Sequence, residues 1–514
     1  AAFGKTALDA ITDGDRNTAI GYDALTNNTE GFDNVALGYQ ALKSNQTGDR
    51  NIAIGRGALF SNTVDYNVAV GHSAMYANTD GTNNTAYGYN AVYANTTGDR
   101  NIGIGYAALD NADTENDNLA IGYDALGGSL AGGEFNVAIG NYVLDANTSG
   151  DYNVALGNQA MSANTTGESN LAIGHVALGS NTSGSYNVGV GHSGLNGNTT
   201  GARNTALGYG ALDYPDTEND NLAIGYDALG GSINGGEFNV AIGNYSLDAL
   251  TTGDNNIAIG YQALTTNTTG ERNTTSGYRA LYNNTAGGYN VAMGAGVMYS
   301  NTEGSYNTAL GAGALWTNTT GTRNIAIGYS SYDGADTEND NLAIGYDALG
   351  GSIAGGEYNV AIGNYSMDAL TSGDYNTAIG YNTLTANTYG YNNTAVGSKS
   401  LYSNTSGGDN TAAGDQALSL NTTGNYNSAF GTLALLDNIS GSGNTAVGRR
   451  ALENNTSSSN TGVGYYAGDL ITTGSYNTII GREADASANN ATNQTVIGYG
   501  ATGHGDNITV IGNT

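Results

Sequence analysis

Residues 17–33 read NTAIGYDALTNNTEGFD, and variants of this pattern fill the chain. A glycine that follows a small residue and an apolar residue marks each copy, as at Gly21, Gly38 and Gly55. Most steps between these glycines are 17 residues long, and a few are 16 or 18. We number each copy from its asparagine, so that Asn17 stands at position 1 and Gly21 at position 5. About thirty copies account for the 514 residues, which indicates a repeat architecture.

The composition differs from that of an ordinary globular enzyme. The chain contains 81 glycines, one proline, no cysteine and one tryptophan, with 45 acidic and 14 basic residues. The formal charge of −31 argues against nucleic acid as a partner, because phosphates require clustered Lys and Arg, and against anionic lipid. No apolar run approaches the ~20 residues of a membrane helix, so we expect no membrane insertion. The lack of cysteine excludes disulfides and most zinc or thiol chemistry.

The repeat predicts strands rather than helices. A period of 17 is too short for a helical hairpin, and frequent Gly and Thr weaken helices. Two short extended runs fit each copy, one at positions 1–4 and one centred on Ala-Leu at positions 8 and 9, each closed by a turn with a positive-φ glycine. We therefore predict an all-β fold, a parallel β-solenoid (β-roll) of about thirty coils stacked ~4.8 Å apart. The 18-residue copies are expected to hold their extra residue as a bulge at a turn.

The alternation within the first run suggests how chains associate. Positions 2 and 4 carry Thr, Val, Ile or Leu, whereas position 3 is nearly always Ala or Gly. Because side chains alternate across a strand, we expect the large groups to fill the coil interior together with the leucine of position 9. The flat Ala/Gly face would then lie outside and allow another chain to approach closely. A narrow coil buries little apolar surface, so the pattern favours a parallel homo-oligomer, most simply a trimeric rod.

Two strings carry a resemblance to known families. Residues 17–22 (NTAIGY) and 444–448 (NTAVG) resemble the N-S-V-A-I-G repeats of trimeric autotransporter adhesin heads. The longer unit N-T-A-I-G-Y-x-A-L-x-x-N-T-T-G resembles repeats of phage tail fibres and related bacterial surface proteins. The first resemblance implies a left-handed β-roll of three chains that binds a host surface, and the second implies a trimeric shaft. The adhesin heads repeat with a shorter period. The N-T-T-G segment of positions 12–15, which we call the corner, therefore has no counterpart there.

The last coils depart from the pattern. Position 3 becomes Ile479, Val496 and Val510, and the step from Gly498 to Gly512 shrinks to 14 residues. We expect residues 1–481 to form the repetitive shaft and residues 482–514 to be its last coils and a transition toward a further C-terminal domain. A hydrophobic cap is the alternative. The segment 493–514 resembles the stretch that precedes the intramolecular chaperone of tail fibres.

An acidic sequence replaces the N-T-T-G corner three times. Each replacement follows the pattern D-x-x-D-T-E-N-D, and the next coil has 18 residues and contributes one more glutamate. Calcium prefers six to eight oxygen ligands and tolerates irregular loops, so these corners are candidate Ca²⁺ sites. A solvated acidic corner or a duplicated segment without a ligand is the alternative. The candidate ligands are Asp110, Asp113, Glu115, Asp117, Glu134, Asp213, Asp216, Glu218, Asp220, Glu237, Asp333, Asp336, Glu338, Asp340 and Glu357.

The same carboxylates could in principle form a glycosidase pair. A catalytic site is normally one irregular cleft, whereas this acidic sequence recurs three times without an insertion large enough to form a pocket. We therefore expect no catalytic residues and no enzyme activity. Apart from calcium, no cofactor is expected.

Tyrosine, histidine and asparagine recur in fixed positions. Tyrosines at position 6, such as Tyr22 and Tyr39, and before the asparagine, such as Tyr289, predict stacked aromatic columns. Sugar stacking is the functional alternative. His175 and His192 share position 6 on successive coils and are interpreted as members of the column, or as a metal site if a threefold axis lies near. The asparagine of position 1 predicts a hydrogen-bonded ladder.

These observations favour a structural role outside the cell. We expect the shaft of a surface-attachment device, either a phage tail fibre or an adhesin, located extracellularly or on a virion surface. Its expected partners are further copies of itself and a cell-surface glycan or protein receptor. The alternative is a bacterial extracellular structural filament or matrix protein that assembles end to end.

Overall fold

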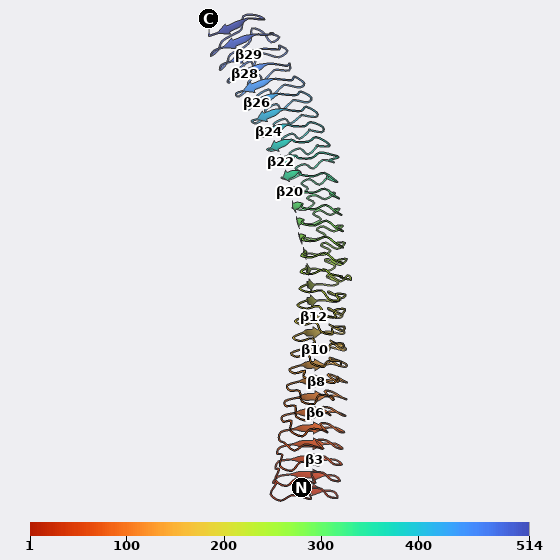
Figure 1. Cartoon of the computed structure of the whole chain (residues 1–514). Helices are drawn as coiled ribbons and strands as arrows, with labels where there is room; N and C mark the ends of the chain where they lie inside the picture. Colours follow the sequence, from red (N-terminus) through yellow and green to blue (C-terminus); the bar gives the residue numbers. More distant parts are fainter. Residues whose placement is uncertain (513–514) are drawn as a thin grey trace. The chain divides into compact units, whose positions relative to one another are not determined.

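The computed structural model describes residues 1–512, and these residues form short parallel strands joined by turns, with no helix among them. Contacts divide the chain into two compact units, unit 1 (Ala1–Asn256) and unit 2, which begins at Ile257. Within each unit the strands are stacked in sequence order, one per coil (Figure 1). The prediction of an all-β parallel solenoid with a 17-residue period is confirmed.

Almost every strand covers positions 2 to 4 of its copy. The strands of unit 1 are β1 (Ala2–Phe3), β2 (Thr18–Ile20), β3 (Val35–Leu37), β4 (Ile52–Ile54), β5 (Val68–Val70), β6 (Thr85–Tyr87), β7 (Ile102–Ile104), β8 (Leu119–Ile121), β9 (Val137–Ile139), β10 (Val154–Leu156), β11 (Leu171–Ile173), β12 (Val188–Val190), β13 (Thr205–Leu207), β14 (Leu222–Ile224) and β15 (Val240–Ile242). Those of unit 2 are β16 (Ile257–Ile259), β17 (Thr274–Ser276), β18 (Val291–Met293), β19 (Thr308–Leu310), β20 (Ile325–Ile327), β21 (Leu342–Ile344), β22 (Val360–Ile362), β23 (Thr377–Ile379), β24 (Thr394–Val396), β25 (Thr411–Ala413), β26 (Ser428–Phe430), β27 (Thr445–Val447), β28 (Thr461–Val463), β29 (Thr478–Ile480), β30 (Thr495–Ile497) and β31 (Thr509–Ile511).

Equivalent positions of successive coils face each other. Thr18 of β2 pairs with Val35 of β3, one coil further along, and the same parallel register recurs within each unit. An 18-residue coil keeps this register, since Leu119 of β8 still pairs with Val137 of β9. The extra residue is therefore absorbed in the turns, as predicted.

The inward and outward sides of the strands are reversed relative to our expectation. The alanines of position 3, such as Ala19 and Ala36, are completely buried, whereas Ile20 and Leu37 of position 4 are 40% and 42% exposed. The prediction that large residues point inward and small ones outward is wrong. The opposing turn sets the limit, because a Cβ at Gly103 of position 3 would lie only 2.5 Å from a methyl carbon of Val92. Most coils therefore carry glycine or alanine at position 3, and Thr275 of β17 is a larger residue buried there.

The second extended run does not form either. The Ala-Leu segment is a turn in which two residues that are not glycine adopt the left-handed conformation, for example Asp23 and Leu25 with φ of 52° each. This conformation directs the leucine of position 9 into the coil, where Leu25 and Leu42 are completely buried. The leucine fills the space opposite the strand of the next coil and so forces position 3 to be small.

Buried asparagines hold the turns together in two ladders. At position 1, the backbone N–H of Asn34 donates to Asn17 Oδ1 at 2.9 Å, and Asn34 Nδ2 donates to the Gly48 carbonyl at 2.8 Å. At position 12, Asn45 Nδ2 donates to Asn28 Oδ1 of the previous coil at 2.8 Å. Such bonds satisfy backbone groups that the strands leave unpaired. The predicted asparagine ladder is confirmed.

The last coils keep the fold although position 3 is larger there, because a smaller residue lies opposite it at position 9. Ile479 at position 3 is completely buried, and the residue opposite it is Gly468 instead of leucine. A Cβ at Gly468 would lie 2.8 Å from Leu452 Cδ2 and 3.5 Å from Ile479 Cγ1, so it would already be in contact with the isoleucine and a full leucine side chain would not fit beside it. β29, β30 and β31 pair in parallel like the earlier strands. The enlarged position 3 is therefore accommodated inside the solenoid, while residues 513–514 lie outside the described residues.

Candidate functional site

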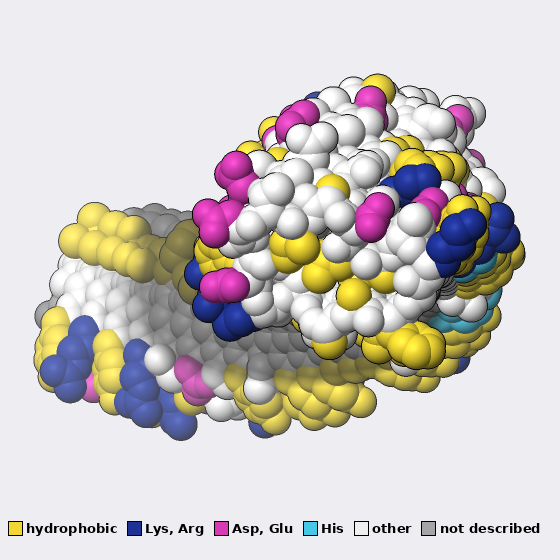
Figure 2. Space-filling view, turned by 90° about the horizontal axis from the view of Figure 1, so that it is seen from below, with side chains coloured by type: hydrophobic (Ala, Val, Ile, Leu, Met, Phe, Trp, Pro, Cys, Tyr) yellow, Lys and Arg dark blue, Asp and Glu magenta, His cyan; other side chains and the backbone are white. Residues whose placement is uncertain are grey.

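The outward side of the strands carries rows of large apolar residues. Position 4 is at least partly exposed throughout, as at Ile104, Ile173 and Leu207 in unit 1 and Met293 and Ile379 in unit 2. Figure 2 shows hydrophobic side chains gathered in rows at the surface. Monomeric soluble proteins rarely expose apolar patches larger than a few hundred Å², and larger ones mark contact surfaces. We call the outward side chains of positions 2 and 4 the strand face.

The glutamates of the three acidic corners are structural anchors. Glu115 is buried and accepts hydrogen bonds from the backbone N–H groups of Asp113, Thr114 and Gly132 at 2.8 to 3.0 Å. Gly132 belongs to the following 18-residue coil, so the glutamate ties the corner to the longer turn. The glutamates of the other two corners, Glu218 and Glu338, make the same three bonds.

A second substitution makes room for this glutamate. In an ordinary coil position 15 is glycine, since a Cβ at Gly48 would lie 2.4 Å from Asn45 Oδ1 of position 12. In the acidic corner Ala112 replaces that asparagine, so Glu115 fits at position 15. The acidic corner and the 18-residue coil after it therefore form one structural unit, which the buried glutamate joins.

The other predicted ligands also have partners within the chain. Asp113 accepts a hydrogen bond from Thr96 Oγ1, and Asp216 and Asp336 accept the equivalent bonds. Asp117 pairs with Arg100 through two bonds of 2.6 and 2.8 Å, which lower its pKa, and Asp220 and Asp340 pair likewise. Glu134 accepts a bond from Asn116 at 2.7 Å, as do Glu237 and Glu357 from their asparagines.

Asp110 differs from the other acids of its corner because it is half-buried and lies near a further acid, Asp124. Burial and, to a smaller extent, the charge of Asp124 raise the pKa of Asp110 to about 6. Asp213 and Asp333 are shifted in the same direction, mainly by burial. Residues 1–512 contain no group of three or more His, Asp or Glu placed to hold a metal ion. Calcium binding at these corners stays a prediction, which a calorimetric titration tests.

Sequence reasoning missed the acids that surround Asp110. Asp124 acts on both Asp110 and Asp145, which lie one coil to either side of it. The same arrangement recurs around Asp227 and Asp347. The available signal was the threefold recurrence of Asp at position 7 together with Asp at position 10 of the flanking coils.

The aromatic columns are present as predicted. Tyr106 and Tyr123 stack with ring centroids 5.0 Å apart, and Tyr289 stacks on Tyr306 at 4.8 Å. His175 and His192 continue the position 6 column, with their rings 4.9 Å apart. A third column, at position 10, was not predicted, and it includes Phe60, Tyr76 and Tyr93. The columns support one coil on the next.

Comparison of the chain with protein-family models and with curated proteins finds no match. None of the described residues belongs to a helix long and apolar enough to cross a membrane.

Proposed function

We propose that the chain is the shaft of a surface-attachment fibre in which parallel copies pack side by side through their strand faces. The observation that supports this proposal is the outward position of the large apolar residues, exemplified by Ile379 and Val396, which are 38% and 40% exposed. A thin coil filled by alanines and one leucine has no interior space for them. Contact with another copy would remove them from water.

The regular spacing makes this contact cumulative. Removing apolar surface from water contributes roughly 25 cal/mol per Å². Because the strand face repeats on each coil of a unit, a small gain per coil is multiplied along two aligned copies. Under this proposal the protein lies outside the cell or on a virion, acts as a passive element rather than an enzyme, and displays binding sites for a cell-surface glycan or protein.

Light scattering tests the proposal on the intact chain. We expect three times the mass of a single chain, and the variant Ile379→Lys/Val396→Lys is expected to shift the mass toward the monomer. The matched control is Asn382→Lys/Gln416→Lys, which adds the same charge at position 7, where Lys399 already occurs. A wild-type monomer would overturn the proposal. An open series of masses would replace it with a filament that assembles end to end.

A further inference from the structure

The position 6 aromatic column of unit 2 is interrupted for two consecutive coils. Tyr278 and Tyr329 hold this position on the flanking coils, whereas Ala295 and Ala312 hold it between them. Position 7 of the same two coils is glycine, so neither position 6 nor position 7 carries a side chain larger than a methyl group there. Two adjoining hollows of about 260 and 320 Å³ result, and they share Ala295 and Trp316 in their walls. We call the pair the Trp316 groove.

An exposed indole forms the main apolar surface of the Trp316 groove. Trp316, the only tryptophan of the chain, stacks on Tyr299 with ring centroids 4.8 Å apart and remains 41% exposed. Tyr299 stacks in turn on Tyr282 at 5.2 Å. The next residue of this column is Asp333, so the aromatic stack ends at the indole.

Gly296 is required by the indole rather than by the backbone. Its φ is 60°, but Arg279 and Ser330 adopt 52° and 47° at the same position of neighbouring coils. A Cβ at Gly296 would instead lie 2.2 Å from Cζ3 of Trp316. The glycine therefore lets the indole lie across the groove.

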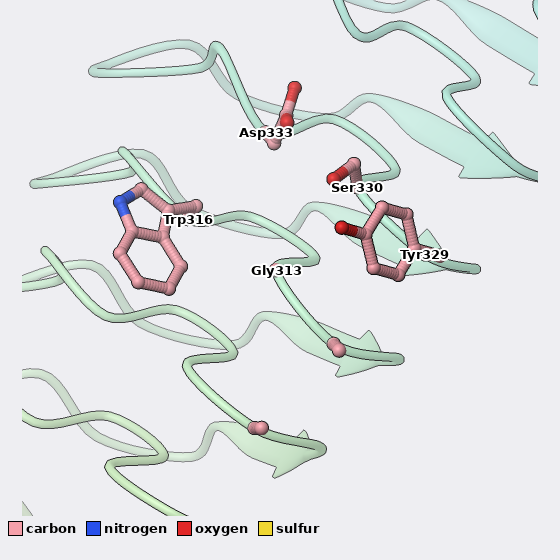
Figure 3. Close-up of a pocket in the computed structure, with 7 residues that line it drawn as sticks. Gly313, Trp316, Tyr329, Ser330 and Asp333 are labelled. Atoms are coloured by element: carbon pink, nitrogen blue, oxygen red, sulfur yellow. The ribbon is translucent and has the colours of Figure 1, made fainter.

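Polar groups lie at both ends of the groove. At one end the Arg279 guanidinium lies 5.2 Å from the Tyr278 ring centroid, and its Nε donates to Gln262 at 2.8 Å. At the other end Tyr329, Ser330 and Asp333 line the hollow beside the indole (Figure 3). Burial raises the pKa of Asp333, as does the charge of Asp347.

We propose that the Trp316 groove binds a short, flat oligosaccharide of neutral or amino hexoses in β-1,4 linkage. Such a ligand has an apolar C–H face that stacks on an indole and hydroxyl groups that bond to the carboxylate, hydroxyl and guanidinium at the ends. The flanking tyrosines are three coils apart, about 14 Å at the strand spacing, which suits a chain of a few sugars. The formal charge of −31 disfavours acidic sugars.

This site would give the proposed fibre an attachment function, but it is independent of how copies associate. The groove lies over positions 6, 7 and 10, whereas the strand face consists of positions 2 and 4. A chain that forms the expected trimer and binds no sugar would overturn this inference alone. A monomer that binds sugar would overturn the shaft alone.

The single tryptophan provides the measurement. Titration with cellotriose and with chitotriose is expected to give a saturable change in Trp316 emission. Maltotriose, a curved chain, and sialyllactose, an anion, serve as comparisons, and a tighter response to either would overturn the assignment. No saturable change with cellotriose or chitotriose would overturn the site itself.

A variant that restores the column separates binding from folding. Ala312→Tyr places in the groove the residue that position 6 holds in many other coils, so it is expected to keep the circular dichroism spectrum and melting temperature. Its dissociation constant is expected to rise about tenfold or more, a loss of about 1.4 kcal/mol. Ser398→Tyr adds the same side chain at position 6 outside the groove and is the control. Equal binding by Ala312→Tyr and wild type, measured by calorimetry, would contradict the proposal.

Discussion

At the scale of single residues, the interior of a coil is a contact between position 3 and position 9 of the preceding coil. Gly189 and Leu178 form such a pair, and a Cβ at Gly189 would lie 3.2 Å from Leu178 Cγ. Gly468 and Ile479 form the inverted pair near the C-terminal end of the described residues. The two positions therefore divide one fixed volume between them.

An exchange of these volumes predicts a rescue. Gly189→Ile alone is expected to destabilise unit 1 by about 1–3 kcal/mol through overpacking. Leu178→Gly alone is expected to cost about 2–5 kcal/mol through the cavity it leaves. The double variant is expected to be more stable than the sum of the two losses predicts, as chemical denaturation would show. Additive losses would mean that the two side chains do not share the space.

Asp485 predicts a pH-dependent stability. Burial, with a smaller contribution from a hydrogen bond with Asp469, raises its pKa to about 7 from an ordinary value of 3.8. Between these values the folded chain holds a proton that the unfolded chain has released. The contribution of Asp485 is therefore most favourable below pH 3.8, declines as the pH rises, and levels off above about 7.

The variant Asp485→Asn isolates this effect. Its amide oxygen can still accept the Leu470 and Ala486 backbone bonds. We expect the melting temperature of the variant to fall less than that of wild type between pH 5 and pH 8, as measured by circular dichroism. Parallel curves for the two proteins would assign the pH dependence to other groups.

At the scale of the coil, the asparagine ladder adds side-chain hydrogen bonds to the backbone hydrogen bonds that join successive coils. Asn290 Oδ1 accepts from the Asn307 backbone N–H at 2.9 Å, and its Nδ2 donates to the Gly304 carbonyl at 2.8 Å. The strands have two or three residues each, so these side-chain bonds and the backbone bonds of the turns together fix how one coil follows the next.

Removal of one ladder member is expected to be costly. Asn290→Ala leaves the buried N–H of Asn307 without a partner, whereas the Gly304 carbonyl keeps its bond from Asn301 Nδ2 at 3.0 Å. We therefore expect a loss of about 1–3 kcal/mol in chemical denaturation. Asn454 is exposed, lies outside the left-handed region and donates to the Asp469 carbonyl, so Asn454→Ala is expected to change the free energy of unfolding by less than about 0.5 kcal/mol. Equal effects of the two substitutions would contradict the role of the ladder.

The sequence predicts the coil and its period, but not which face of the strand is buried in the interior. The 17-residue spacing and the ladder follow from the positions of Gly21 and Asn17 alone. Alternation in β2 shows two faces without showing which one is buried. That choice depends on the left-handed turn that directs Leu25 inward, and strand propensity favoured an extended run there instead. The Trp316 groove was missed because two alanines read as ordinary small residues.

At the scale of the whole molecule, charge opposes the proposed assembly. Each chain carries a formal charge of −31, so parallel chains repel one another across their contact. Salt screens this repulsion over about 8–10 Å at physiological strength and over shorter distances when concentrated. Association is therefore expected to strengthen with ionic strength.

Sedimentation at two salt concentrations tests this expectation. The dissociation constant of the oligomer is expected to fall about tenfold or more between about 20 mM and about 500 mM sodium chloride. EDTA in both buffers excludes an effect of contaminating calcium. Weaker association at high salt would show that ion pairs, and not the apolar strand face, hold the copies together.

Register in this fold is counted in whole coils, and this has a consequence for the gene. Deleting or duplicating the codons of one complete 17-residue copy brings equivalent residues into contact again, with the alanine row, the leucine row and both ladders unbroken. A deletion that is neither a whole number of coils nor a single residue absorbed in a turn, as in the 16- and 18-residue coils, brings a residue with a side chain to the position of Gly21, where the carbonyl of Gly38 excludes a Cβ. Recombination between repeats can thus change the number of coils in single steps, and a lineage can adjust the reach of the molecule without redesigning its fold.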